Sequence, residues 1–143
     1  MQHFDDMRQK MAVYTRFAIS EFKNILRRDI PNVSVEYDER EPTDSSLFAI
    51  CVYIGTGIHG LGSRLPDEES VCIQFDYQKL DVYYWLTADI VFGGRLVDIW
   101  DEELPLDASC EEVEARGCHV AKRFTELLPL FAEQTLKFFR PYC

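Results

Sequence analysis

The sequence predicts a two-layer α+β domain, in which helices at the two ends of the chain cover one face of an antiparallel sheet of four or five strands. Apolar residues recur every three or four positions near both termini, as on an amphipathic helix. Between them the pattern changes to the period of two that is typical of strands. Links between successive strands are too short for crossover helices, which indicates antiparallel pairing. We expect a single domain over residues 1–143.

The first helix is predicted from an apolar stripe that begins at Phe4 and continues to Ile25. Its basic residues mostly occupy the other faces. Pro31 ends it, because proline lacks a backbone donor and moves Ile30 out of the α region.

Four segments are then predicted to be strands: 33–41, 47–55, 70–78 and 80–92. The third alternates most clearly between apolar and polar residues, which indicates one buried face. Segment 47–55 is apolar on both faces and is expected in the centre of the sheet.

The end of the sheet is predicted from a glycine pair. Gly93-Gly94 is compatible with a two-residue hairpin turn. The turn would lead into a short fifth strand at 95–100, followed by an acidic loop at 101–108.

A second helix is expected after that loop. Ser109 and Glu112 have the spacing of a capping box, and an apolar stripe follows. Pro129 lies inside the stripe and should kink or split the helix, which ends near Phe139.

The stretch "YIGTGIHGLG" at 53–62 contains the G-x-G-x-x-G spacing at Gly55, Gly57 and Gly60. A dinucleotide site needs a helix directly after these glycines, and the chain instead returns to a strand pattern. We therefore expect a connection between strands and no cofactor. A partner-binding loop is the main alternative.

Composition narrows the class of protein. The chain is 47% hydrophobic and carries a formal net charge of -10, which favours a packed domain that repels nucleic acid and attracts basic proteins. No apolar run approaches the length of a membrane span, and no secretory signal is evident. Five cysteines without a C-x-x-C pair indicate a reducing compartment, most simply the cytoplasm.

No catalytic or metal-binding constellation is recognisable. The three histidines lack metal-ligand spacing, and Cys118 and His119 are neighbours that point in different directions on a helix. A pair of His59 with Cys51 or Cys118 across the fold is conceivable, but nothing in the sequence specifies it. We therefore predict no enzyme activity and no metal.

Acidic clusters are the most distinctive feature, and they could be a docking face, an ordinary solvated surface or, less simply, a calcium site. Tyr83 and Trp85 share one strand face, which is either exposed for binding or buried, for example in a dimer interface. The predicted partner-binding residues are Glu36, Asp38, Glu39, Tyr83, Trp85, Asp98, Trp100, Asp101, Glu102, Glu103, Asp107 and Glu111.

These features predict a protein-binding inhibitor of a basic protein. In size and charge the chain is similar to immunity proteins that neutralise a cognate bacterial toxin, for example a nuclease. One alternative is an acidic, dimeric secretion chaperone for an effector protein. The other is a small-ligand binder or enzyme that uses the loop at 55–64.

Overall fold

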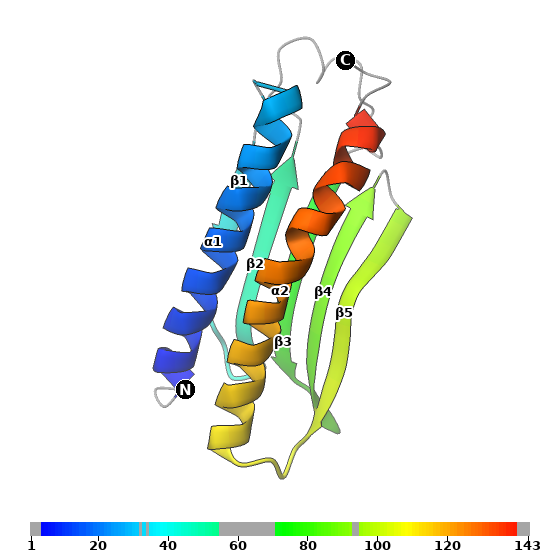
Figure 1. Cartoon of the computed structure of the whole chain (residues 1–143). Coiled ribbons are helices and arrows are strands. Elements are labelled where there is room, and N and C mark those ends of the chain that lie inside the picture. The colour runs from blue at the N-terminus through cyan, green and yellow to red at the C-terminus, as the bar shows by residue number, and fades with distance from the viewer. Residues whose placement is uncertain (1–3, 32, 34, 55–70, 93–94, 140–143) are drawn as a thin grey trace.

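The chain folds as two layers, a five-stranded sheet and a pair of helices on one of its faces (Figure 1). A computed structural model describes residues 4–31, 33, 35–54, 71–92 and 95–139. The elements in order are α1 (Asp5–Asp29), β1 (Val35–Glu39), β2 (Ser46–Ile54), β3 (Val71–Lys79), β4 (Tyr83–Phe92), β5 (Arg95–Pro105) and α2 (Cys110–Phe139). The strands pair antiparallel in chain order, β1-β2-β3-β4-β5.

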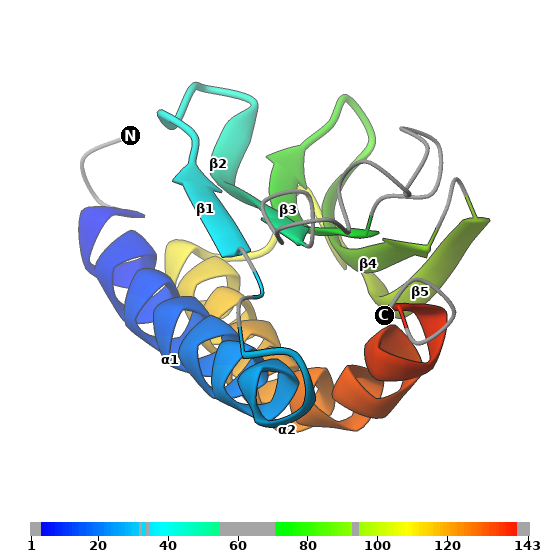
Figure 2. The ribbon, with the colours of Figure 1, turned by 90° about the horizontal axis from the view of Figure 1, so that it is seen from above.

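This arrangement confirms the predicted α+β fold with terminal helices. Seen from above, both helices lie on the same side of the sheet (Figure 2). The glycine-rich loop at 55–64 and the Gly93-Gly94 turn lie outside the described residues.

α1 forms because one stripe of its surface is apolar and packs into the core. Met7, Met11 and Phe22 on this stripe are at most 1% exposed. At the C-terminal end, the backbone N–H of Ile30 donates to the carbonyl of Leu26 at 2.9 Å, and the helix stops before Pro31 as predicted.

The sheet follows the alternation in the sequence. In β3 every second side chain is fully buried toward the helices, and the intervening ones are half-buried on the other side. β2 is the exception, with seven of its nine residues buried. Its side away from the helices carries small residues such as Ala49 and Cys51, which neighbouring side chains cover easily.

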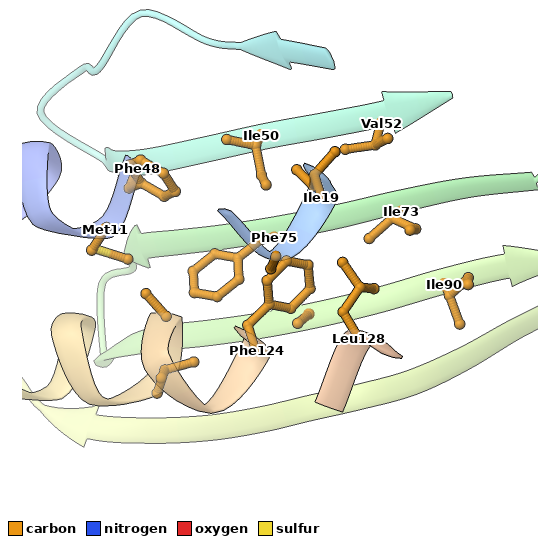
Figure 3. Packing of buried hydrophobic residues seen from close by; sticks show 14 of the residues in the cluster. Met11, Ile19, Phe48, Ile50, Val52, Ile73, Phe75, Ile90, Phe124 and Leu128 are labelled. Atoms are coloured by element: carbon orange, nitrogen blue, oxygen red, sulfur yellow. The ribbon is translucent and has the colours of Figure 1, made fainter. Parts of the chain in front are cut away.

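The core lies between the sheet and the helices, and Phe75 is at its centre (Figure 3). The Phe75 ring meets Phe48 and Phe124 edge-on, with ring centroids 5.8 and 5.3 Å apart. Full burial of each such side chain contributes roughly 1.5–3 kcal/mol. Tyr77 is also buried, and its hydroxyl donates to the carbonyl of Val113 on α2 at 2.9 Å.

A glycine allows α2 to approach both the sheet and α1. A Cβ atom at Gly117 would lie 2.9 Å from the Tyr77 ring and 3.0 Å from the sulfurs of Met7 and Met11. The absence of a side chain at position 117 is therefore part of the packing.

The start of α2 is capped as predicted, because the Ser109 hydroxyl accepts the backbone N–H of Glu112 at 3.2 Å. Pro129 does not split the helix, which runs as one element to Phe139. Figure 2 shows the C-terminal part of α2 bending toward β4 and β5. Phe138 there packs against Phe92, with ring centroids 5.9 Å apart.

The prediction of an acidic loop at 101–108 was wrong for the first five of these residues, which belong to β5. The expected short strand at 95–100 is therefore the first half of a longer one. Pairing with β4 explains the difference, because Leu104 lies opposite Tyr84 and is only 6% exposed. Tertiary pairing outweighs the low strand propensity of the acidic residues.

Candidate protein-binding surface

We call the side of the sheet that faces away from both helices the open face. The pairing register assigns each strand residue to one side, and contacts to α1, such as that of Tyr37 with Thr15, mark the helix side. The open face contains Glu36, Asp38, Arg40, Ala49, Cys51, Tyr53, Cys72, Gln74, Asp76, Gln78, Tyr83, Trp85, Thr87, Asp89, Val91, Leu96, Asp98, Asp101 and Glu103.

This face is strongly acidic. Seven of its side chains are carboxylates: Glu36, Asp38, Asp76, Asp89, Asp98, Asp101 and Glu103. Among the strand and strand-end residues that the structure describes, Arg40 is the one base on it. The Arg40 guanidinium donates to the Cys51 sulfur at 3.1 Å. An excess of negative charge on one surface attracts cations over a distance.

Some of the clustered acids of the sequence lie at opposite margins of this face. They are Glu36 and Asp38 on β1, and Asp98, Asp101 and Glu103 on β5. The margins are roughly 19 Å apart, since neighbouring strands lie about 4.8 Å from one another. Asp76 and Asp89 on β3 and β4 occupy the space between them. The fields of the clusters overlap through these two carboxylates, because the screening length in physiological salt is about 8 Å.

Asp89 and Asp98 form a pair of like charges. They lie directly opposite each other on β4 and β5. Burial, followed by the hydrogen bond to Asp98, raises the pKa of Asp89 to about 6, although the Thr87 hydroxyl opposes this by donating to the Asp89 carboxylate at 3.2 Å. A cation placed against the pair would stabilise the ionised form.

Aromatic side chains accompany the acids. The register places Tyr83 and Trp85 together on one face, as the sequence predicted, and this is the open face, whereas Tyr84 and Leu86 are on the helix side. The Trp85 indole N–H donates to the Asp101 carboxylate at 2.6 Å. Tyr53 on β2 is 44% exposed. Aromatic groups with a polar end are common anchors in protein interfaces.

Two predicted partner-binding residues face the helices instead. The Trp100 indole N–H donates to Glu102 at 2.9 Å, and Glu102 also forms an ion pair with Arg116 of α2. The Trp100 ring meets His119 edge-on. These contacts hold β5 against α2, so both residues have a structural role on the helix side.

The other predicted residues lie off the open face as well. Glu39 pairs with Arg16 of α1 at 2.8 Å and accepts the Tyr37 hydroxyl at 2.6 Å. Asp107 is exposed in the turn after β5, and Glu111 is exposed in the first turn of α2.

Sequence reasoning missed Asp76, Asp89, Tyr53 and Arg40. The alternation of residues 71–78 could have identified Asp76, because it places this carboxylate opposite the buried face. Nothing local distinguishes Asp89, since its neighbour Asp98 is brought to it by the pairing of β4 with β5.

The candidates for chemistry within the described residues are potential metal ligands and cysteine thiols. They contain no group of three or more potential metal ligands close together. Cys72 is half-buried on the open face, and burial raises the pKa of its thiol, which makes it a weaker nucleophile. Burial also raises the pKa of the Cys118 thiol on α2.

A hollow of about 440 Å³ lies between α1 and the β1–β2 region, and its lining includes Arg40 and Ala49 at the margin of the open face. Arg8 forms part of its wall and donates to the carbonyl of Leu47 at 2.6 Å. The remaining lining side chains are mainly apolar or arginine, with Glu39 as the acid among them. This hollow does not contain a nucleophile paired with a base.

No family model, curated protein or solved structure matches this chain. Within the described residues, neither helix combines the length and the apolar character that crossing a membrane requires.

Proposed function

We propose that this chain is a protein-binding inhibitor that acts on a basic protein, and more specifically an immunity protein that neutralises a cognate bacterial toxin such as a nuclease. The observation that carries the proposal is the excess of carboxylates on the open face, where the described strand and strand-end residues contribute seven carboxylates and a single arginine. An enzyme that binds phosphate keeps a basic cleft, and an acidic surface can occupy such a cleft.

The sheet suits this role because it holds the charges in place. The open-face acids on β3, β4 and β5 project from paired strands, and the core behind them is closely packed. Little backbone freedom is therefore lost when a partner binds, which lowers the entropic cost of association.

Charge would provide fast and selective association, and the aromatic groups would provide contact area. Trp85, Tyr83 and Tyr53 lie among the carboxylates, where a partner could exclude water from them. Trp and Tyr in such positions often account for most of the affinity of an interface.

The proposed location is the bacterial cytoplasm, where an inhibitor can intercept a toxin that attacks intracellular targets. Cys51, Cys72, Cys110 and Cys118 are free thiols, which fits a reducing compartment.

The test has two steps. First, the immobilised chain is used to capture proteins from a lysate of its source cells at low and at high salt. Then a captured basic protein is expressed alone and together with this chain. We expect expression alone to be toxic and co-expression to restore growth, with capture weakened by salt.

Other outcomes would support the alternatives. A stable dimer that captures an unfolded effector segment with little dependence on salt would indicate a secretion chaperone. Capture that is unaffected by salt and gives no relief of toxicity would contradict the inhibitor proposal.

A further inference from the structure

The longest strand of the sheet is at its margin. β5 has eleven residues, and among the described strands its one partner is β4, whereas β1 at the opposite margin has five residues. Figure 1 shows β5 along the side of the molecule, with no other described element beyond it. In the described part of the chain, the backbone bond that β5 makes outside this pairing is at its end, from Ala108 N–H to the Pro105 carbonyl at 3.1 Å.

An edge strand of this length is unusual, because it presents a row of unpaired backbone donors and acceptors to other chains. Proteins commonly keep edge strands short, or place charges or bulges on them. β5 has a register irregularity opposite Ala88 and Asp89, and it carries charge on both sides. Asp98, Asp101 and Glu103 are exposed on its open-face side.

These charges determine which strand could pair with β5. A second copy of β5 would bring its own carboxylates close to these three, and like charges on adjacent strands are destabilising. A strand with lysine or arginine at alternate positions would instead place cations beside the same carboxylates. The carboxylates that disfavour pairing of β5 with a second copy of itself therefore also favour its pairing with a basic strand.

The other side of β5 would accept small apolar residues. Val97 and Ile99 are half-buried and pack against the edge of the core. A sixth strand could extend this apolar margin with its own alternate side chains.

We propose that an extended basic segment of the partner adds to β5 as a sixth strand, with backbone hydrogen bonds to its free edge and cationic side chains against Asp98, Asp101 and Glu103. This inference rests on the proposed inhibitor function and specifies how the partner docks. Backbone pairing supplies affinity in this binding mode, and the alternate side chains supply specificity.

The experiment uses the whole chain labelled with nitrogen-15 and a synthetic peptide of about nine residues that alternates lysine and valine, a length matched to a long edge strand. Amide hydrogen exchange is followed residue by residue at low salt, with and without the peptide. We expect alternate amides of β5 to exchange at least about tenfold more slowly when the peptide is bound. Amides of β1 should be unaffected.

Two variants control for the role of charge. Asp101→Lys combined with Glu103→Lys should abolish the protection of β5. Glu21→Gln combined with Glu126→Gln removes two exposed helix acids and should leave the protection intact. Exchange of core amides in each free variant verifies that it is folded.

Three results would overturn strand addition. They are peptide binding without slower exchange in β5, equal protection in both variants, and no binding at low salt. The first would leave the proposed inhibitor function standing, because the peptide would then contact the acidic face through its side chains alone. The capture and co-expression test decides that function independently.

Discussion

The two sides of one sheet have opposite chemistry, although their residues alternate along the same strands. In β3, Phe75 is fully buried against the helices, while its neighbours Gln74 and Asp76 are on the open face. A strand turns successive side chains to opposite sides, so the two sets are interleaved in sequence but separate in space. Stability and partner binding should therefore respond to different mutations.

The open face is not arranged for stability alone. Seven carboxylates on one surface repel each other, and Asp89 and Asp98 lie directly opposite one another. Like charges in this position are destabilising. Sites that bind a partner often carry such a cost, because the partner relieves it.

The largest loss of stability should come from mutation of a core residue on the helix side of the sheet. Phe124→Ala removes a ring that is 1% exposed and packs on Phe75. We expect a loss of about 3–5 kcal/mol in the free energy of unfolding, measured with urea. Glu103→Ala on the open face should change this free energy by about 0.5 kcal/mol or less. Comparable losses in both variants would contradict the separation of the two sides.

A smaller effect is expected where α2 contacts the sheet. Gly117→Ala gains about 1 kcal/mol of helix propensity, but overpacking costs typically about 1–3 kcal/mol. The Tyr77 ring cannot move away easily, because it is fully buried and its hydroxyl is bonded to Val113. We expect net destabilisation of about 1 kcal/mol in thermal unfolding. A more stable variant would show that the contact is loose.

The smallest expected effect on stability is its pH dependence through Asp89 on the open face. Because the pKa of Asp89 is raised to about 6 in the folded state, its contribution to stability is fully present below its unfolded pKa and is lost as pH rises through about 6. Acidification from about pH 7.5 to about pH 5.5 should therefore favour the folded state through this group.

Asp89→Asn is the test of this linkage. At neutral pH the variant should be more stable than the wild type by about 0.5 kcal/mol at most, since solvent screens a half-buried group. Its melting temperature should also depend less on pH over this interval. An unchanged pH dependence would show that the pKa of Asp89 is not raised in the folded state.

Much of the fold could be predicted because its signals are local. The apolar stripe of α1, the Ser109 cap and the alternation in β3 each depend on residues close in sequence. The second half of β5 could not be predicted in this way. Its acidic residues are poor strand formers, and only pairing with β4 places Leu104 in the core.

The negative charge of the candidate site could be predicted from the sequence, but the set of residues that share its surface could not. Acidic clusters are visible in the sequence, yet the register decides which of their members share a face. Asp101 and Glu103 are on the open face, while Glu102 between them is paired with Arg116 on the helix side. Asp89 joins the site only through its cross-strand neighbour.

The most direct test compares two variants that lose the same charge at different places. One carries Asp98→Asn, Asp101→Asn and Glu103→Gln on the open face. The other carries Glu21→Gln, Glu126→Gln and Glu133→Gln on exposed helix surfaces. The association rate with the captured basic partner is measured at low salt. We expect the open-face variant to associate about tenfold more slowly than the wild type, and the helix variant to differ by less than about twofold. Equal slowing in both variants would mean that net charge alone attracts the partner, and would contradict the assignment of the open face.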